Sequence, residues 1–447
     1  MTETNCFTFT SCRYETETRT AFLNYGYSSG EEFCEAIHFP GARTAFSPEE
    51  KRALERLVNM LHLAAGISYY KAFCPPRILV NTQKISPDEA EFFTKFYLRG
   101  LGEFSVENNL DLDGIIAFPV TTTDIPGPEH PPLPQGDVIP IGGGKDSLVS
   151  VEILRKAGRP FRPIAVNAGR PILEVIGAAD CSDPILISRK IDPGLFLLNK
   201  QGAYNGHVPI TGILSFIMAM GSILYGYDTV IMSNEQSANE GNMSRDGIEI
   251  NHQYSKSLEF EQDFSHFISH HVLSGFYYFS LLRPLSETGI ALLFSRAPQY
   301  FSTFKSCNRN FHIAQGQRHY GWCGDCPKCR FVFLALAPFI GKAGLIRIFG
   351  RNLLDDETQE RGFRLLSGLE GHKPFECVGE IGECRLLLKS LALLPEWQDS
   401  IIISRLAPEI MEQGLSPHDL ATASLQKHTG HALPADYERL LDDFIGT

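Results

Sequence analysis

Three consecutive glycines, Gly142–Gly144, limit the possible folds of this chain more than any other sequence feature. They end the apolar run that begins at Val138. The polar residues Lys145–Ser147 come next, and the apolar-periodic segment Leu148–Leu154 follows them. This order predicts a strand, a tight loop and the N-terminus of a helix. Glycines let backbone N–H groups converge on an anion, and the helix dipole adds positive charge at the same point. The sequence therefore predicts a phosphate-binding loop.

The loop does not have the Walker A pattern, which requires glycine where Ile139 stands and serine or threonine where Asp146 stands. It instead resembles the Ser-Gly-Gly-x-Asp-Ser loop of pyrophosphate-loop ATP enzymes, which release AMP and pyrophosphate, although Gly142 replaces the first serine. The resemblance implies ATP as a substrate and Asp146 as a ligand of Mg²⁺. A glycine-rich turn without a ligand is the alternative. The implied nucleotide-binding residues of the loop are Gly142, Gly143, Gly144, Lys145, Asp146 and Ser147.

Composition indicates an ordinary folded protein. A chain of 447 residues, 43% hydrophobic and 21% charged, is expected to form two or three domains. Its formal net charge of −12 argues against nonspecific nucleic-acid binding, which needs a basic surface. The first residues lack the basic and apolar pattern of a secretory signal. We therefore expect a cytoplasmic protein that does not bind nucleic acid.

The most apolar segment, Val208–Tyr227, is long enough to suggest a membrane span. It has no basic flank, it contains Pro209, and the predicted strand Thr229–Met232 follows it at once. A buried helix that leads into a central strand is the favoured interpretation. No association with a membrane is expected.

Changes in local pattern divide the chain into four parts and predict an α/β fold. The core is expected to be a doubly wound, mostly parallel sheet with helices on both faces, because strands and helices alternate there. The four parts are an N-terminal α+β accessory domain (1–120), a proline-rich linker (121–136), the nucleotide-binding core (137–336) and a helical C-terminal region (337–447). The predicted core strands are Val138–Ile141, Pro163–Val166, Ile185–Ile187 and Thr229–Met232.

Two helices of the N-terminal domain are marked by capping boxes. Ser47 and Ser86 are each followed by proline and, three residues after the cap, by glutamate. Gly66 is expected to end the first helix. The alternation in Phe7–Thr10 predicts a strand with one exposed face. Packing or surface roles are expected for Tyr69–Lys71, with contact to a substrate as the alternative.

Polar runs follow two points of the predicted core where a doubly wound sheet places its ligands. Asn234 and Glu235 come after a strand, and Asn251, His252 and Lys256 come after a glycine-bearing loop. His252, Lys256 and Glu235 are the titratable side chains, so they are the candidates for proton transfer. Solvated loops without a catalytic role are the alternative.

Asn167 and Gly169 end the second predicted strand of the core. In pyrophosphate-loop enzymes this position approaches the adenine or the ribose, so the resemblance implies a nucleotide contact. A plain turn between strand and loop is the alternative.

Four cysteines, Cys307, Cys323, Cys326 and Cys329, have the spacing C-x15-C-x2-C-x2-C, which can place four thiolates around a tetrahedral ion. Because no secretory signal is visible, a structural Zn²⁺ is favoured over disulfides. Free buried cysteines or a redox Cys-x-x-Cys pair are the alternatives. A similar cluster closes the core of the 7-cyano-7-deazaguanine synthases, which also carry the pyrophosphate loop.

Several blocks spread over nearly the whole chain are specific in combination. They are Ser68–Lys71, Pro140–Ser150, Asn205–His207, Asn251–Gln253, Ser306–His312, the tricysteine turn Cys323–Cys329, Phe349–Asp356 and His372–Glu380. With these blocks the chain resembles the bacterial UDP-N-acetyl-α-D-muramoyl-L-alanyl-L-glutamate epimerase family. The resemblance implies an ATP- and Mg²⁺-dependent inversion of the terminal L-glutamate of the muramoyl dipeptide precursor. It also implies coupling to a ligase that adds L-glutamate during peptidoglycan synthesis.

The expected chemistry is activation of the glutamate carboxylate as an acyl-adenylate, followed by proton removal and return at Cα. The expected substrate-binding residues are Asn234, Asn251, Arg309, Arg351 and Lys373. Surface salt bridging is the alternative for the basic residues. Two other functions stay open. One is an amide- or nitrile-forming enzyme of the deazaguanine synthase type, and the other is a nucleotide-binding protein without catalysis.

Overall fold

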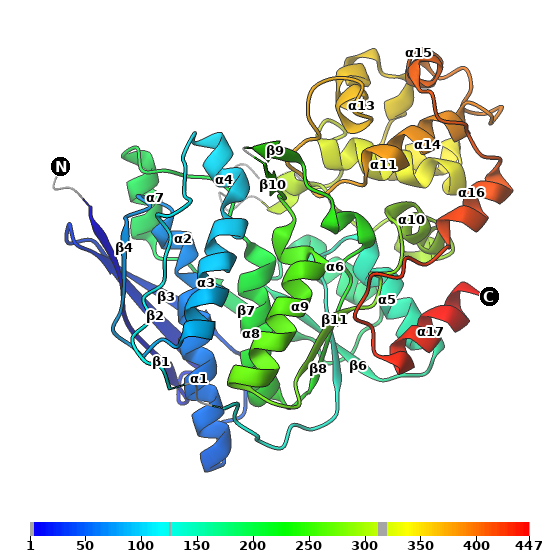
Figure 1. Ribbon diagram of the computed structural model, residues 1–447. Coiled ribbons are helices and arrows are strands. Elements are labelled where there is room, and N and C mark those ends of the chain that lie inside the picture. The colour runs from blue at the N-terminus through cyan, green and yellow to red at the C-terminus, as the bar shows by residue number, and fades with distance from the viewer. Residues whose placement is uncertain (1–3, 125–126, 246, 312–319, 447) are drawn as a thin grey trace. The chain divides into compact units, whose positions relative to one another are not determined.

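The computed structural model describes residues 4–124, 127–245, 247–311 and 320–446 (Figure 1). In these ranges nine strands form one mixed sheet in the order β11-β8-β5-β6-β7-β3-β2-β1-β4, and β9 (Met243–Arg245) pairs with β10 (Ile248–Ile250). The α/β class is therefore confirmed, whereas the pyrophosphate-loop fold stays a prediction. The strands of the large sheet are β1 (Cys6–Glu15), β2 (Thr20–Tyr27), β3 (Glu32–His38), β4 (Arg77–Val80), β5 (Asp137–Pro140), β6 (Phe161–Val166), β7 (Ile185–Lys190), β8 (Thr229–Met232) and β11 (Tyr277–Ser280).

The chain divides into two compact units, neither of them continuous in sequence. Unit 1 consists of Met1–Val138, Ile185–Val230 and Ile250–Tyr278. Unit 2 consists of Ile139–Pro184, Ile231–Glu249 and Phe279–Thr447.

Unit 1 carries the antiparallel part of the sheet. β2 pairs antiparallel with β1 and with β3, β3 pairs antiparallel with β7, and β4 pairs parallel with β1. Ile37 lies opposite Arg189 in the β3–β7 pair. Phe7 and Phe9 are buried while Thr10 is exposed, which confirms the predicted one-faced strand.

Three helices of unit 1, α3, α8 and α9, lie side by side in Figure 1, and aromatic contacts join α3 to the other two. Phe92 stacks on Phe267 with ring centroids 4.2 Å apart, and Phe93 lies 5.8 Å from Phe216. The α-helices of this unit are α1 (Pro48–Ala65), α2 (Ile67–Tyr70), α3 (Pro87–Gly100), α4 (Gly102–Glu107), α7 (Pro193–Lys200), α8 (Ile210–Tyr225) and α9 (Leu258–Phe267).

Local sequence signals placed three of these helices correctly. Ser47 and Ser86 each form a complete capping box, at the starts of α1 and α3, and Gly66 caps the C-terminus of α1. α8 is the predicted buried helix, and β8 follows it as predicted. Among the helices in the described ranges, none is long and apolar enough to cross a membrane.

Unit 2 packs its helices around α11, which contacts α10, α12, α13 and α14. Figure 1 shows α11 to α14 in yellow to orange. The spacing of apolar residues predicts helices in Phe331–Leu336, Glu360–Leu369, Cys384–Leu394 and Tyr437–Phe444, and these stretches overlap α11, α13, α14 and α17. The α-helices of this unit are α5 (Lys145–Lys156), α6 (Arg170–Ala178), α10 (Glu287–Ser295), α11 (Pro327–Ile340), α12 (Lys342–Phe349), α13 (Glu360–Leu366), α14 (Ile381–Leu391), α15 (Ile401–Leu406), α16 (Pro417–Ser424) and α17 (Ala435–Ile445).

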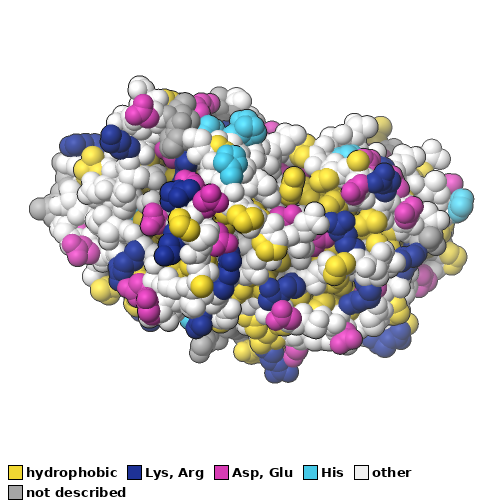
Figure 2. Space-filling view, turned by 90° about the horizontal axis from the view of Figure 1, so that it is seen from below, with side chains coloured by type: hydrophobic (Ala, Val, Ile, Leu, Met, Phe, Trp, Pro, Cys, Tyr) yellow, Lys and Arg dark blue, Asp and Glu magenta, His cyan; other side chains and the backbone are white. Residues whose placement is uncertain are grey.

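The surface mixes charges of both signs. Figure 2 shows Lys and Arg side chains interspersed with Asp and Glu side chains over the face it presents. Ion pairs are one reason for this mixing. Arg52 Nε, for example, lies 3.1 Å from Glu129 Oε2, and Lys95 Nζ lies 2.6 Å from Asp263 Oδ2.

Candidate functional site

The glycine loop has the predicted strand–loop–helix form. β5 ends at Pro140, and α5 begins at Lys145 with Gly144 as its N-cap. Gly143 has φ +89°, a left-handed conformation that L side chains rarely adopt. A Cβ on Gly144 would lie 2.9 Å from Ser306 Oγ, so that position accepts no side chain without a shift. The loop therefore uses its glycines for backbone geometry, as an anion-binding loop requires.

Lys145 does not extend into solvent. Its ammonium pairs with the carboxylates of Asp146 and Glu287, and Lys145 and Glu287 are each 1% exposed. Burial opposes the lysine charge, but the two carboxylates outweigh it and raise the pKa of Lys145 above its usual range. Burial raises the pKa of Glu287 to about 7. The neighbouring carboxylate of Asp146 adds to this increase, because both carboxylates share one ammonium. Lys145 and Asp146, predicted to bind phosphate and Mg²⁺, thus belong to a charged cluster.

Glu287 was missed by sequence reasoning. It begins α10 after the N-cap Ser286, and an acidic residue in the first turn of a helix is ordinary. Only the contact with Lys145, which lies far away in sequence, distinguishes Glu287 from other such residues.

The predicted proton-transfer candidate Glu235 is buried in unit 2 beside other fixed polar groups. Arg283, itself buried, donates to the backbone oxygen of Glu235 at 2.6 Å. The neighbouring Asn234 Nδ2 donates to Ser280 Oγ at 3.0 Å. Both residues therefore occupy defined positions after β8, as expected for the end of a core strand.

Asn167 and Gly169 lie between β6 and α6. Asn167 has φ +53°, a left-handed conformation that asparagine tolerates better than most residues. Gly169 is the N-cap of α6. Their nucleotide contact remains a prediction.

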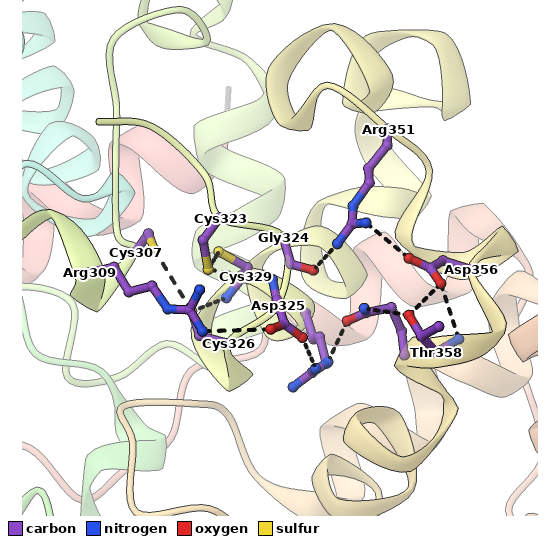
Figure 3. Close-up of polar contacts among 12 residues, drawn as sticks. Cys307, Arg309, Cys323, Gly324, Asp325, Cys326, Cys329, Arg351, Asp356 and Thr358 are labelled. Atoms are coloured by element: carbon purple, nitrogen blue, oxygen red, sulfur yellow. Dashed lines mark hydrogen bonds and ion pairs between the residues drawn. The ribbon is translucent and has the colours of Figure 1, made fainter. Parts of the chain in front are cut away.

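The four predicted cysteines converge in unit 2 (Figure 3). Cys307 Sγ lies 3.9 Å from Cys326 Sγ, and Cys323 Sγ lies 3.7 Å from Cys329 Sγ. All four sulfur atoms lie within 4.8 Å of one another. Tetrahedral zinc with Zn–S bonds of about 2.3 Å requires sulfur–sulfur distances of roughly 3.8 Å. The set therefore fits a Zn²⁺ ion.

Backbone N–H groups support the same sulfur atoms. The amide nitrogen of Cys329 donates to Cys326 Sγ and that of Asp325 donates to Cys323 Sγ, each at 3.4 Å. Hydrogen bonds from Cys326 and Cys329 lower the pKa of Cys307, whereas the same contacts raise the pKa of Cys329, so without a metal ion the thiols of the cluster ionise one before another. Thiolates are the ligand form of cysteine.

Arg309 and Arg351, predicted to bind substrate, surround the cysteine turn (Figure 3). Arg309 Nη2 lies 3.6 Å from Asp325 Oδ2. Arg351 Nη2 donates to the backbone oxygen of Gly324 at 2.8 Å, and its Nη1 lies 3.1 Å from Asp356 Oδ2. Their guanidinium groups already have partners in the protein, and their binding of substrate stays a prediction. His312, which ends one of the motif blocks, lies outside the described residues.

Lys373 is also paired. Its Nζ lies 2.6 Å from Glu240 Oε2, and the side chain is 2% exposed. Asn242 Nδ2 donates to the backbone oxygen of the next residue, Pro374, at 2.8 Å. The segment that carries Lys373 is thus tied to the loop after β8 within unit 2.

A second polar cluster lies in unit 1 and contains the predicted proton-transfer residue His252. His252 Nδ1 makes a hydrogen bond to Glu103 Oε2, and His207 Nδ1 lies 3.5 Å from the same oxygen. The two imidazole rings are 4.3 Å apart. Lys256 and Asn251 belong to the same segment as His252, and Lys256 acts electrostatically on His207.

The ligand atoms of Glu103, His207 and His252 lie within 4.8 Å of one another, a spacing that a divalent ion also permits. Burial, followed by the charges of His252 and Lys256, lowers the pKa of His207 to about 3, so this imidazole is neutral near neutral pH. Glu103, on the short helix α4, was missed by sequence reasoning. No motif distinguishes it, and only folding brings it to residues 207 and 252.

Lys71, expected to have a packing or surface role, is buried at 4% exposure next to this cluster's segments. Its Nζ donates to Asn205 Oδ1 at 3.0 Å. Tyr69 and Tyr70 are fully buried, as expected of packing residues. The structure therefore brings together parts of three motif blocks, which include Lys71, Asn205, His207 and His252.

The structure is a mixed α/β protein with two clusters of titratable side chains and a tetracysteine set, and comparison with known proteins identifies its family. The family model described as the MurL N-terminal domain matches residues 1–281, and that of the MurL C-terminal domain matches residues 303–420. The chain belongs to the MurL family and is an epimerase, an enzyme of the isomerase class.

Three relatives support this assignment, each named UDP-N-acetyl-alpha-D-muramoyl-L-alanyl-L-glutamate epimerase. The protein of Xanthomonas oryzae pv. oryzae is 41% identical, over 98% of this chain and 97% of its own length. That of a Micromonospora species is 39% identical, over 98% of both chains. That of Salinispora tropica is 38% identical, over 91% of this chain and 89% of its own. No solved structure matches the chain.

Proposed function

We propose that this chain inverts the terminal L-glutamate of UDP-MurNAc-L-Ala-L-Glu to D-glutamate, with ATP as the activating substrate. The observation that carries the proposal is the similarity, over nearly the full length, to three relatives named for epimerisation of this dipeptide. The product would enter peptidoglycan precursor synthesis after a ligase has added L-glutamate. The epimerase names favour this reaction over amide or nitrile formation.

Activation explains why ATP is needed. The α-proton of a carboxylate is barely acidic, because its removal would place two negative charges side by side. Attack of the carboxylate on the α-phosphorus of ATP gives an acyl-adenylate and releases diphosphate. The adenylate carbonyl can then hold the electron pair of the broken Cα–H bond. Hydrolysis of the inverted adenylate gives D-glutamate and AMP.

The glycine loop is the part of the chain that suits this activation. Backbone N–H groups near Gly143 and at the start of α5 would bind phosphate oxygens. Asp146 would hold Mg²⁺, which neutralises phosphate charge when bound. The Lys145 ammonium has Glu287 and Asp146 as partners in the structure, and the third of its three N–H donors would contact a phosphate oxygen.

Proton transfer at Cα is assigned to His252, with Lys256 and Glu235 as the further candidates. The hydrogen bond between its Nδ1 and Glu103 Oε2 orients the imidazole ring of His252, and an oriented imidazole is the usual general base at neutral pH. A positioned general base typically contributes about 10²–10⁴-fold to rate. Substitution of His252 should therefore spare adenylation and remove inversion.

The cysteine cluster would hold a structural Zn²⁺ through Cys307, Cys323, Cys326 and Cys329. Four protein ligands close a tetrahedral site, which leaves no open position for chemistry. The ion would cross-link the segment around Cys307 to the N-terminus of α11. Asn234, Asn251, Arg309, Arg351 and Lys373 remain the proposed residues for substrate binding.

The test is incubation of the purified protein with UDP-MurNAc-L-Ala-L-Glu, ATP and Mg²⁺ in heavy water. Hydrolysed glutamate is analysed for chirality and deuterium, and AMP is followed alongside. D-glutamate that carries deuterium, formed together with AMP, supports the proposal. AMP with nitrogen incorporation and no inversion would instead indicate an amide-forming enzyme. Inversion without AMP would overturn the acyl-adenylate.

A further inference from the structure

Lys71 occupies an unusual environment for a lysine. It follows α2 directly, its side chain is buried, and its Nζ donates to the neutral amide oxygen of Asn205. The same Nζ lies 5.8 Å from the ring centroid of Phe104. Within the described ranges of the chain, no carboxylate lies within ion-pair distance of this ammonium. Burial lowers the pKa of Lys71 to about 8.

Such an environment is costly to maintain. Lysine is almost never fully buried unless it is paired, because a charged ammonium loses its hydration. One amide oxygen and one aromatic ring replace that hydration only in part. Buried titratable groups with a perturbed pKa cluster at functional sites. Lys145 and Lys373 are equally buried, but each has a carboxylate partner.

Lys71 and His252 are held by the same two short segments. Glu103 bonds His252, and the next residue, Phe104, faces Lys71. Asn205 bonds Lys71, and His207, two residues later, packs its ring against that of His252. Residues 103–104 and 205–207 therefore position both titratable groups within unit 1.

Inversion needs a proton donor on the face of Cα opposite to the base. Two nitrogens that flank one carbon, each at about 3–3.5 Å, are roughly 6–7 Å apart. His207 is a poor donor, because burial and the charges of His252 and Lys256 lower its pKa to about 3, and its ring packs on the same side of Glu103 as that of His252. The candidates for the donor are therefore the other buried titratable groups of unit 1.

We propose that Lys71 is the second proton-transfer residue of the epimerisation. The inference rests on the function proposed above. His252 takes the Cα proton, and the electrons of the broken C–H bond move to the adenylate carbonyl oxygen. The Lys71 ammonium then gives a proton to the other face of Cα and becomes an amine. Exchange with solvent returns both side chains to their starting protonation states.

The test follows deuterium at Cα with the L-glutamyl substrate, ATP and Mg²⁺ in heavy water. Lys71→Gln should lower inversion by about 10² or more. It should still place deuterium in recovered L-glutamate, because His252 removes the proton and returns deuterium to the same face. His252→Gln should show neither exchange nor inversion. AMP release should persist in both variants.

Lys71→Arg separates proton donation from simple charge. A guanidinium keeps the positive charge but does not release a proton near neutral pH. The arginine variant should therefore exchange without inverting, as Lys71→Gln does. Inversion restored by arginine would overturn the proposal and indicate an anion-binding lysine. Loss of exchange together with inversion in both Lys71 variants would also overturn it.

Two controls complete the design. Lys51→Gln makes the same chemical change at an exposed position of α1 and should leave all rates unchanged. Thermal unfolding of each variant shows whether it folds. If Lys71→Gln does not fold, the exchange and inversion rates of Lys71→Arg decide the test. A wild-type protein that forms no D-glutamate would refute the proposed function itself, a result distinct from failure of the Lys71 variants.

Discussion

Lys145 and Glu287 form an ion pair that is closed to solvent, with each residue only 1% exposed. The lysine begins α5, directly after the glycine loop, and the glutamate begins α10. The pair therefore connects the loop to a helix that the chain reaches about 140 residues later. A buried pair of this kind fixes geometry more than it adds net stability, because both charges lose their hydration.

Removal of Glu287 should destabilise unit 2. Glu287→Ala leaves the buried Lys145 ammonium with Asp146 alone, and loss of one partner from a buried pair typically costs about 3–5 kcal/mol. Urea unfolding should show this decrease in the free energy of unfolding. The double variant Lys145→Met with Glu287→Leu should recover much of it, since the only charge that then loses its lysine partner is that of Asp146, whose side chain is partly exposed. Equal instability of the single and double variants would contradict the role of charge.

Asp146→Asn should abolish diphosphate release. The amide keeps the shape of the side chain but removes the charge that the proposed Mg²⁺ ligand needs. Release is measured with ATP and the dipeptide substrate. Asp180→Asn is a suitable control, because Asp180 has φ +46°, a conformation that asparagine tolerates. An Asp146→Asn protein with normal release would refute the assignment.

One equivalent of zinc should accompany the purified chain and depend on the four cysteines. Cys326→Ser should lower the zinc content measured by elemental analysis and reduce the temperature of unfolding. Cys34→Ser changes an exposed cysteine of β3 outside the cluster and should leave both unchanged. A chain that purifies without zinc, and whose unfolding temperature does not respond to added zinc, would contradict the site.

Stability should fall in mild acid because of His62. Its Nε2 lies 2.8 Å from the backbone oxygen of Asn24, its Nδ1 has no partner, and burial lowers its pKa to about 4. The unfolded chain protonates this imidazole near pH 6.5. The neutral folded form therefore loses stability as the pH falls from about 6.5 to about 4, by up to roughly 3 kcal/mol.

Urea midpoints at pH 7 and pH 4.5 measure this effect. His62→Leu should reduce the difference between the two midpoints, whatever its cost at pH 7. His266→Gln, at an exposed position of α9, should leave the difference unchanged. An undiminished difference in the His62 variant would show that other groups carry the acid sensitivity.

Sequence reasoning worked where the signal was local. The capping boxes at Ser47 and Ser86 located α1 and α3, because the cap and its glutamate lie within one turn of each other. The cluster of cysteines could be predicted from the sequence because three of its four members, Cys323, Cys326 and Cys329, lie close together in the chain.

The partners of the titratable residues could not be predicted. Glu103 and His252 are 149 positions apart, and Lys145 and Glu287 are 142 apart. Acidic residues in short helices are common, so neither glutamate carries a local signal. The pairing of β3 with β7 was also unpredictable, because register between distant strands depends on the whole sheet.

The β3–β7 pair limits which fragments of the chain can be expressed alone. Arg189 of β7 bonds Glu35 of β3 through two nitrogens, at 2.6 and 3.1 Å, and also donates to Ser68 Oγ at 3.0 Å. A fragment that starts after residue 136 would keep a buried arginine without its carboxylate and a strand without its neighbour. Unpaired strand edges promote aggregation. A fragment meant to contain the glycine loop should therefore be expressed together with the N-terminal strands.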